Sequence, residues 1–576
     1  MATGVVSQCK HTHNGFSDCQ TTTPTATLNR PICAIAIVTL QPRNYTFLDS
    51  WLFAPGVDLV FGELENMAQQ DSIFIGASRK PDDSYQRPES LLLKYGNRHG
   101  LITGATGTGK TVTLQILAEG FSNAGVPVFC ADIKGDLSGI AAVGEPKDFL
   151  LKRAEAVKLD PYEFRETPVI FWDLFGEQGH PIRATVTEMG PLLLSRLMNL
   201  TNAQEGVLNI AFKIADEEGL LLLDMKDLQS MLAHMATRSE ELSARYGNVN
   251  KTSVGAIQRS LLVLEQQGGK NFFGEPALRI PDIMRTTPDG RGAVNVLAAD
   301  KLMTNPRLYS TFLLWLLSEL FEELPEVGDP EKPRLVFFFD EAHLLFNEAP
   351  KALLDRVEQV VRLIRSKGVG VYFVTQNPLD VPETVLAQLG NRIQHALRAY
   401  TPRETNAVKV AADTFRPNPD FKTFEAITNL STGEALVSTL EDKGVPSMVQ
   451  RTLIRPPSSR IGPLTPEERR KVINASPVTG QYDQMVDRES AYEILLARAK
   501  QGQTAPQGET QASGGGWTLP DFGGGGSKQP TGRRTAQPRA SGRRTVAEAA
   551  IKSVVRSVGS SLGRALVRGI LGSLKR

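Results

Sequence analysis

The feature that most constrains this chain is a glycine-rich stretch within residues 99–118. Its spacing fits the phosphate-binding pattern G-x-x-x-x-G-K-[ST]. A short apolar run precedes the pattern, as a buried strand would, and apolar residues at helical spacing follow it. The sequence therefore predicts a strand, a phosphate-binding loop and a helix, in that order. The residues that fit the pattern are Gly104, Gly109, Lys110 and Thr111.

The residue types of this stretch suit the phosphates of a nucleotide. Glycines let successive backbone N–H groups point at phosphate oxygens, and a helix N-terminus adds favourable partial charge. Lys110 would reach the β- and γ-phosphates, and the Thr111 hydroxyl would hold Mg²⁺. A glycine-rich turn without a ligand is the alternative. The predicted nucleotide-binding residues are Gly104, Ala105, Thr106, Gly107, Thr108, Gly109, Lys110, Thr111 and Val112.

The composition is typical of a globular protein, but its charge is unevenly distributed. Of the 576 residues, 41% are hydrophobic and 22% are charged, which is ordinary for a chain with a large core. The segment 528–576 holds twelve Lys and Arg and one acidic residue, so it carries +11, and the rest of the chain carries −10. A mildly acidic body with a basic tail indicates an anionic partner for the tail.

The cysteines and the hydropathy favour a cytoplasmic location. Four cysteines are present, three of them within the first 33 residues, and none has metal-ligand spacing. We therefore expect a reducing compartment without a disulfide framework, with Cys130 as a buried apolar residue. The most apolar stretch, around 312–317, is too short to cross a bilayer and is expected to be a core helix. No secretory signal fits the N-terminus.

Beyond the loop, strand-like and helix-like segments alternate, which predicts an α/β fold with a parallel sheet. A second strand, 127–131, ends at Asp132, whose carboxylate would lie near the ligand crevice or form a turn. The segment 145–325 is mainly helical in pattern, with strand-like runs at 169–172 and 293–297. We interpret 145–325 as a helical insertion and assign it no function.

An apolar strand followed by two acids is the second strong motif. The strand covers 334–339 and leads directly into Asp340 and Glu341. Asp340 would hold Mg²⁺, and Glu341 would accept a proton from an attacking water molecule. An acidic strand end without a role is the alternative.

Two more strands are predicted, at 368–375 and 392–397. The first ends at Gln376, whose amide would contact the γ-phosphate or make a structural hydrogen bond. An arginine beside the second could reach the nucleotide of a neighbouring subunit, as arginine fingers do, or pair with surface acids. The candidate arginines are Arg392, Arg398 and Arg403.

The two ends of the chain differ from its middle. Residues 1–66 show no clear period, so they are either a disordered extension or not translated, with Met67 as the start. A helix predicted within 476–500 precedes a linker, 501–542, rich in Gly, Pro, Gln and Ser, to which we assign no fold. Helical periodicity returns in 543–576, which predicts a basic amphipathic helix. Its partner would be the chain's own body or a neighbouring subunit, nucleic acid, or an anionic membrane surface.

Taken together, these motifs resemble the HerA/FtsK group of ATPases, and more closely the YjgR-like proteins related to HerA. The resemblance rests on the phosphate loop, on Phe-Phe-Phe-Asp-Glu-Ala-His at 337–343 and on Val-Thr-Gln-Asn-Pro at 374–378. It covers about residues 67–576, with 67–475 as the ATPase domain, and leaves 1–66 unmatched. The stretches that point to the subfamily are 97–139, 171–223, 252–276, 335–345, 482–493 and 568–574.

The resemblance implies a RecA-like parallel sheet with an extra strand between the two nucleotide motifs. It also implies hydrolysis of ATP with Mg²⁺ and, for characterised relatives, hexameric rings that pump double-stranded DNA. HerA-type helicases carry an N-terminal β-barrel, for which too few residues precede the loop here, so ring assembly and nuclease partnering stay open. By position, Lys110 and Thr111 match the phosphate and Mg²⁺ residues, Asp340 and Glu341 the metal and base positions, Gln376 the sensor, and Arg392 an arginine near the subunit boundary.

Three functional hypotheses follow from the sequence. The first is a ring-forming ATPase motor on double-stranded DNA, which we favour. The second is an ATPase that acts on a protein or membrane partner, and the third is a nucleotide-binding scaffold without turnover. A GTPase is disfavoured because no Asn-Lys-x-Asp motif occurs. A kinase is disfavoured because adjacent Asp and Glu suit water activation better than transfer to a substrate.

Overall fold

The computed structural model describes residues 71–346 and 351–504, all of which belong to one compact unit, Leu64–Arg576. Three of the expectations above lie outside the described residues. They are the N-terminal extension 1–66, the linker beyond residue 504 and the basic helix 543–576.

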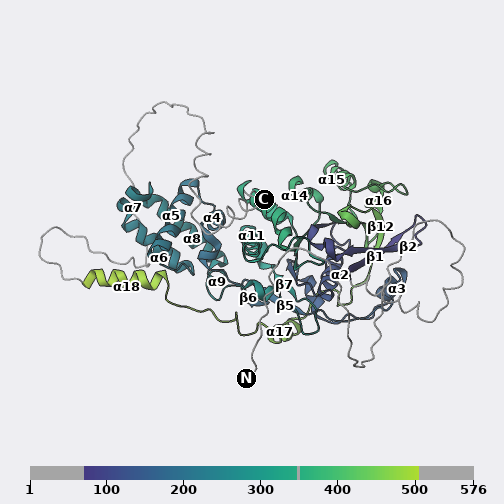
Figure 1. Cartoon of the computed structure of the whole chain (residues 1–576), viewed down its shortest axis with the longest axis horizontal. Coiled ribbons are helices and arrows are strands. Elements are labelled where there is room, and N and C mark those ends of the chain that lie inside the picture. The colour runs from purple at the N-terminus through teal and green to yellow at the C-terminus, as the bar shows by residue number, and fades with distance from the viewer. Residues whose placement is uncertain (1–70, 347–350, 505–576) are drawn as a thin grey trace, which may run out of the picture. The chain divides into compact units, whose positions relative to one another are not determined.

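One large sheet organises the described residues (Figure 1). Its strands are β1 (Ser72–Arg79), β2 (Tyr85–Leu92), β3 (Gly100–Thr103), β4 (Val128–Asp132), β5 (Val169–Asp173), β6 (His180–Pro181), β7 (Val294–Ala298), β8 (Leu335–Phe339), β9 (Val369–Thr375), β10 (Asn391–Gln394), β11 (Glu434–Ser438) and β12 (Gln450–Ile454). They lie in the order β2-β1-β12-β11-β10-β3-β9-β8-β4-β7-β5-β6.

The sheet is parallel in its larger part. Every pairing from β10 through β3, β9, β8, β4, β7 and β5 to β6 is parallel. The pairings that join β10, β11, β12, β1 and β2 are antiparallel and extend one side of the sheet. The predicted α/β fold with a RecA-like parallel sheet is confirmed. Strand β9, with the polar residue that follows it, lies between the strands that precede the two nucleotide motifs, as the resemblance implies.

Helices lie in the connections between these strands and, for the last two, after β12. They are α2 (Lys110–Asn123), α3 (Asp148–Ala156), α4 (Val186–Leu197), α5 (Asn202–Glu218), α6 (Met225–Thr237), α7 (Ser239–Tyr246), α8 (Lys251–Leu264), α9 (Lys270–Phe272), α10 (Ile280–Ile283), α11 (Pro306–Glu323), α12 (His343–Phe346), α13 (Lys351–Ile364), α14 (Glu383–Leu386), α15 (Pro402–Asp413), α16 (Thr423–Asn429), α17 (Pro466–Asn474) and α18 (Ala491–Thr504).

The central strands bury both of their faces. Side chains alternate between the two faces of a strand. On β8, Val336 and Phe338 join an apolar core that contains residues of α2, whereas Phe337 and Phe339 join the core that contains residues of α11 and α13. Every residue of β3, β4, β8 and β9 is buried, as expected for parallel strands covered by helices on both sides. Cys130 on β4 is fully buried, which confirms its predicted apolar role.

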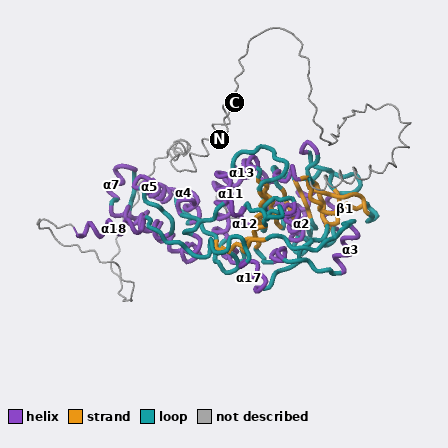
Figure 2. Tube along the Cα trace, turned by 60° about the horizontal axis from the view of Figure 1, so that its bottom comes forward, coloured by secondary structure: helices purple, strands orange, loops and turns teal. Residues whose placement is uncertain are grey.

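The helical part of the chain is narrower than the predicted insertion 145–325. Strand β7 pairs with β4, and β5 pairs with β7, so both strands belong to the central sheet. The helices between them, α4 to α10, occupy residues 186–283. Figure 1 shows α4, α5, α6 and α8 gathered into one group, and α18 packs on α6. In Figure 2, α4, α5, α7 and α18 lie at the same end of the molecule. The strand-like runs predicted at 169–172 and 293–297 are therefore part of the sheet rather than of the insertion.

Two predicted boundaries shift for local reasons. The helix expected within 476–500 is α18, Ala491–Thr504. Pro477 and Gly480, whose φ is 80°, keep the preceding residues in turns. The helix also extends four residues beyond Lys500, into the predicted linker. The strand expected at 392–397 is β10, which ends earlier, at Gln394.

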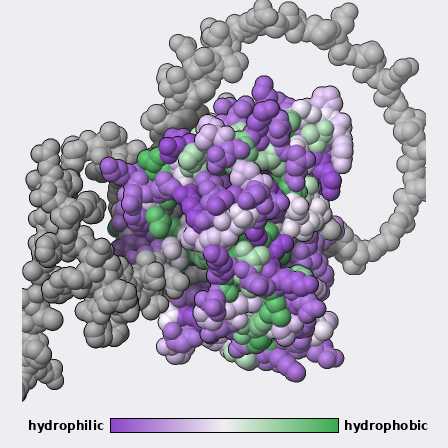
Figure 3. Space-filling view, turned by 90° about the vertical axis from the view of Figure 1, so that its right-hand side faces the viewer, coloured by the Kyte–Doolittle hydropathy of each residue, from purple (hydrophilic) through white to green (hydrophobic). Residues whose placement is uncertain are grey.

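The surface is mainly polar, as expected when the apolar residues are buried. The face seen in Figure 3 is mainly hydrophilic, and apolar residues appear on it in small groups. The apolar segment Phe312–Leu317 is buried inside α11, which confirms the predicted core helix. None of the helices within residues 71–346 and 351–504 combines the length and the apolar character needed to span a membrane.

Candidate functional site

The predicted phosphate loop lies between a central strand and a long helix. The chain leaves β3 at Thr103 and enters α2 at Lys110. Gly107 has a φ of 77° and Gly109, immediately before the helix, has a φ of 114°. Residues with a side chain rarely adopt these conformations. The glycines therefore permit the loop to curl in front of the helix N-terminus, where backbone N–H groups favour an anion.

The lysine of the loop is buried and bends back over it. Nζ of Lys110 donates to the carbonyl oxygens of Gly104 (2.7 Å) and Ala105 (3.2 Å). Burial lowers the pKa of Lys110, and the nearby charge of Lys134 lowers it further. The acids Glu341, Asp340 and Asp136 act in the opposite direction. Lys110 thus lies within electrostatic range of Asp340 and Glu341, the predicted metal and base residues.

A buried histidine, His395, lies beside the loop and contacts the helix that follows it. Ring atom Nε2 of His395 lies 2.8 Å from Oγ1 of Thr113 on α2, and Nδ1 lies 2.9 Å from the carbonyl oxygen of Glu434. Burial lowers the pKa of His395 to about 4, so the ring is neutral near pH 7. Gly433 donates its N–H to the carbonyl of Thr108 (3.0 Å). Sequence reasoning missed His395, because the only signal is its place directly after β10.

The two acids stand at the carboxyl end of β8, as predicted. Burial, followed by the charge of Glu341, raises the pKa of Asp340 to about 6. Oδ1 of Asp340 accepts the N–H of Glu341 (2.9 Å), and Glu341 has a φ of 46°. This backbone conformation is uncommon for a residue with a side chain and is often found at functional sites. Tyr309 donates its hydroxyl to the carbonyl of Asp340 (3.2 Å) and fixes the turn from α11.

Three side chains surround the carboxylate of Glu341. Nε2 of Gln376 donates to both of its carboxylate oxygens (3.2 and 3.3 Å), and Nδ1 of His343 lies 3.3 Å away. Nζ of Lys134 donates to Oε1 over 2.7 Å. Burial raises the pKa of Glu341, but the hydrogen bonds from Lys134 and Gln376 lower it more, so the net pKa is below its usual value. Glu341 is therefore ionised at neutral pH.

Gln376 connects the acids with the phosphate loop. It follows β9, the strand between β3 and β8. Its Nε2 binds Glu341, while its Oε1 accepts a long hydrogen bond from Oγ1 of Thr106 in the loop (3.5 Å). The residue predicted as the sensor thus contacts both the acids and the loop.

The turn after β4 supplies charged groups that sequence reasoning left unassigned. This turn, residues 132–136, carries Lys134, which binds Glu341, and Asp136, whose Oδ2 accepts from Oγ1 of Thr111 over 3.3 Å. Asp132 Oδ1 accepts the N–H of Gly135 (2.8 Å), so Asp132 does form the turn that the sequence offered as one alternative. The signal for the other two residues was only that charged side chains follow a buried strand.

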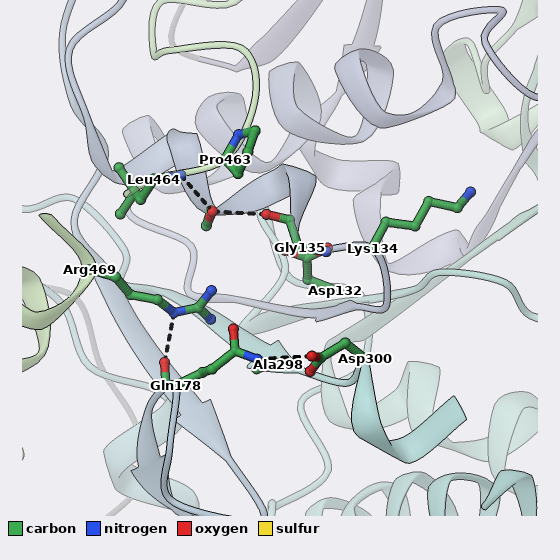
Figure 4. Close-up of a pocket in the computed structure, with 10 residues that line it drawn as sticks. Asp132, Lys134, Gly135, Gln178, Ala298, Asp300, Pro463, Leu464 and Arg469 are labelled. Carbon is green, nitrogen blue, oxygen red and sulfur yellow. Dashed lines mark hydrogen bonds between the residues drawn. The ribbon is translucent and has the colours of Figure 1, made fainter. Parts of the chain in front are cut away.

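A pocket of about 220 Å³ opens on the far side of this turn (Figure 4). Burial raises the pKa of Asp132 to about 7, and the charge of Asp136 adds to the effect. Asp132 Oδ2 and Arg469 Nη2 have no hydrogen-bond partner among the described residues. In Figure 4 the side chain of Lys134 extends away from the other residues that line the pocket. Those residues are Asp132, Gly135, Ser138, Gln178, Ala298, Asp300, Pro463, Leu464 and Arg469.

Arg392 is the predicted site residue that lies apart from the others. Its guanidinium donates to three backbone carbonyls of its own chain, those of Leu386 (3.0 Å), Leu389 (3.1 Å) and Thr414 (3.1 Å). Burial lowers its pKa. These bonds favour a structural role for Arg392 over action on a neighbouring nucleotide. Arg398 and Arg403 are exposed instead.

The donor set of the site suits Mg²⁺ bound together with phosphates. Magnesium takes oxygen ligands and is usually held by one or two carboxylates, waters and substrate phosphates rather than by a protein cage. The Thr111 hydroxyl and the Asp340 carboxylate are ligands of this type. Within residues 71–346 and 351–504, no group of three or more His, Cys, Asp or Glu is arranged to hold a metal ion. The residues therefore fit Mg²⁺ only in company with a nucleotide.

A phosphate loop after a central parallel strand, with acids at the end of a nearby strand, defines the P-loop NTPase class with a RecA-like sheet. Comparison with known proteins narrows the class. The model of the helicase HerA-like C-terminal family matches residues 77–576, so the chain belongs to this family.

The individual relatives either match only part of the chain or have low sequence identity to it. A protein of Methanocaldococcus jannaschii named as a probable helicase is 30% identical over 154 residues, which make up 25% of this chain and 28% of that protein. The chain thus matches little more than a quarter of that relative's length. Among solved structures, the bacterial conjugative coupling protein TrwB is 18% identical over 70% of this chain and 94% of its own, with a TM-score of 0.41. VirB4 of Thermoanaerobacter pseudethanolicus is 15% identical over 66% and 96%, with a TM-score of 0.40.

Proposed function

We propose that this chain is an Mg²⁺-dependent ATP hydrolase that works as a motor on double-stranded DNA. The observation that carries the proposal is the arrangement around Glu341. This buried, ionised carboxylate is held by Gln376, which also touches the phosphate loop, and it stands at the end of a strand two places from the strand that leads into that loop. A triphosphate seated in the loop would meet a carboxylate that is ready to orient water.

The roles of the residues follow from their positions. The backbone of 104–112 would surround the phosphates, and Lys110 would exchange two loop carbonyls for β- and γ-phosphate oxygens, which are stronger acceptors. Mg²⁺ held by Thr111 and Asp340 would neutralise charge that develops on the phosphates. Glu341 would orient the attacking water and take its proton, and Gln376 would report the state of the γ-phosphate to the loop.

Action on DNA is proposed from the family and from the charge of the tail. The family to which the chain belongs is named for a helicase, and one relative is named as a probable helicase. The segment 528–576 carries +11, which suits a polyanion. We propose a cytoplasmic homo-oligomer, a hexameric ring, as the working form. If an arginine acts across the subunit boundary, the exposed Arg398 and Arg403 suit the role better than Arg392 does.

The test is the rate of ATP hydrolysis with and without duplex DNA at low salt, together with the mass of the protein in ATP. We expect turnover that depends on Mg²⁺, rises several-fold with duplex DNA and falls again as salt is added. Deletion of 543–576 should weaken the DNA effect and leave basal turnover intact. Turnover that ignores DNA would contradict the motor proposal. Binding to anionic liposomes that is lost with the same deletion would favour the second candidate, an ATPase at a membrane surface, for which the basic tail is equally suited.

A further inference from the structure

The pair formed by Lys134 and Glu341 joins one exposed and one enclosed side chain. Their Nζ and Oε1 atoms are 2.7 Å apart, and the exposed fractions of the side chains are 43% for Lys134 and 4% for Glu341. The ammonium group therefore reaches the enclosed carboxylate from solvent. It can leave without losing much hydration, whereas Glu341 cannot move into solvent in the same way.

Both lysines of the site bind protein oxygens in this structure. Lys110 donates to the carbonyls of Gly104 and Ala105, and Lys134 donates to Glu341. The two ammonium groups are close enough for the charge of Lys134 to act on Lys110. The oxygens of a γ-phosphate carry full charge and are stronger acceptors than carbonyls. A triphosphate tail in the loop would therefore attract both lysines.

The turn that carries Lys134 is held in place, so movement is left to the side chain. Asp132 Oδ1 accepts the N–H of Gly135 (2.8 Å), and Ser138 Oγ donates to the carbonyl of Gly135 (2.9 Å). Asp136 accepts a hydrogen bond from the hydroxyl of Thr111, the residue directly after Lys110. The side chain of Lys134 projects away from the pocket behind the turn (Figure 4). The backbone thus directs Lys134 toward Glu341, within electrostatic range of Lys110.

We propose that Lys134 is a second phosphate-binding lysine, which holds Glu341 while no γ-phosphate is present and binds the γ-phosphate when a triphosphate fills the loop. This inference rests on the proposed function. Once Lys134 leaves, Glu341 keeps the hydrogen bonds from Gln376, and its Oε1 atom loses the 2.7 Å contact with Nζ of Lys134, which a water molecule can replace. The base is therefore released only when the bond to be cleaved is in place. A diphosphate leaves Lys134 on Glu341.

Calorimetric titration of the full chain with Mg²⁺ and either ADPNP, a non-hydrolysable ATP analogue, or ADP tests this. Lys134→Met should weaken ADPNP binding about tenfold, the worth of a charged hydrogen bond, and change ADP binding less than about twofold. Lys134→Arg should restore most of the ADPNP affinity. The matched control is Lys94→Met, because Lys94 is 47% exposed and forms a 2.7 Å pair with Asp442 outside the site. It should change neither affinity.

A second measurement uses the wild-type protein, so it does not depend on the folding of a variant. Acetylation of lysines, followed by mass spectrometry, should slow at Lys134 with ADPNP relative to ADP and stay constant at Lys94. Equal loss of ADPNP and ADP affinity in Lys134→Met, no loss of either, or equal labelling of Lys134 in both nucleotides would overturn the inference alone. Wild-type protein that binds neither nucleotide would overturn the proposed function.

Discussion

The loop after β3 and the turn after β4 are built alike but specify their roles differently. Each follows a buried parallel strand, each uses a glycine with positive φ (114° at Gly109, 75° at Gly135), and each leads into a helical turn. The first offers backbone N–H groups and one lysine. The second offers side-chain charges, and these bind residues outside the turn: Lys134 binds Glu341, which follows β8, and Asp136 binds Thr111 in α2. The role of the loop after β3 can be predicted from its local sequence, whereas the role of the turn after β4 depends on contacts that form only in the folded protein.

The largest effect is expected from a substitution of Glu341, which Lys134 of the β4 turn contacts. Glu341→Gln removes the carboxylate that Lys134 and Gln376 hold and should lower kcat about 10²- to 10⁴-fold while nucleotide binding is retained. Steady-state hydrolysis assays with binding titrations measure both. The control is Glu145→Gln, because Glu145 is exposed and pairs with Lys147. Unchanged turnover would mean that Glu341 is not the base.

Asp132, in the turn after β4, should make the free energy of unfolding depend on pH. Asp132 has a folded pKa of about 7, raised from 3.8 by burial. The native state therefore keeps a proton that the unfolded chain has already released, and stability falls as pH rises from about 4 to 7. Asp132→Asn should remove about 2 kcal/mol of this loss in the free energy of unfolding. Denaturant titrations at pH 5 and pH 8 measure it, and equal pH slopes for both proteins would contradict the burial argument.

The loop after β3 should be sensitive to its backbone. Gly109→Ala places a side chain where φ is 114° and where a Cβ would lie 3.4 Å from Gly433. We expect a cost of about 1–3 kcal/mol and nucleotide binding weakened about tenfold. Gly206→Ala is the control, because Gly206 lies in α5 and a Cβ there meets nothing within 4 Å. That change should stabilise the chain by about 0.5–1 kcal/mol. Thermal melts and titrations with ADPNP compare the two.

The contact between the two segments gives the smallest expected effect. Asp136→Asn keeps the shape of the side chain that accepts from Thr111 but removes its charge. The Mg²⁺ concentration for half-maximal hydrolysis should rise about tenfold, the lower end of what a residue behind a metal ligand contributes. Hydrolysis rates across a magnesium titration measure this change. An unchanged magnesium requirement would separate the β4 turn from the metal site.

Local chemistry decided how much could be predicted from the sequence. The strands that lead into the predicted phosphate loop, into Asp340 and Glu341 and into Gln376 were predicted where the structure has them, because each is a short apolar run followed directly by a polar or glycine residue. Lys134, Asp136 and His395 were not assigned, since their contacts join segments hundreds of residues apart or separated by other strands. Arg392 was predicted by likeness to relatives, but its three carbonyl partners lie at the end of α14, in the loop after it and after α15, so they meet only in the folded chain. The strands β5 and β7 were recognised but assigned to an insertion, because strand pairing is not local.

Calorimetric titration of the full chain with ATP and Mg²⁺, at a temperature where hydrolysis is slow, tests the central claim most directly. Saturable binding by the wild-type protein, with a dissociation constant on the order of micromolar to millimolar, is expected, and Lys110→Ala should abolish it while the fold is retained. If the wild-type protein shows no affinity for ATP and Mg²⁺, or if Lys110→Ala binds as the parent does, a triphosphate held by this loop is not what the protein is built around.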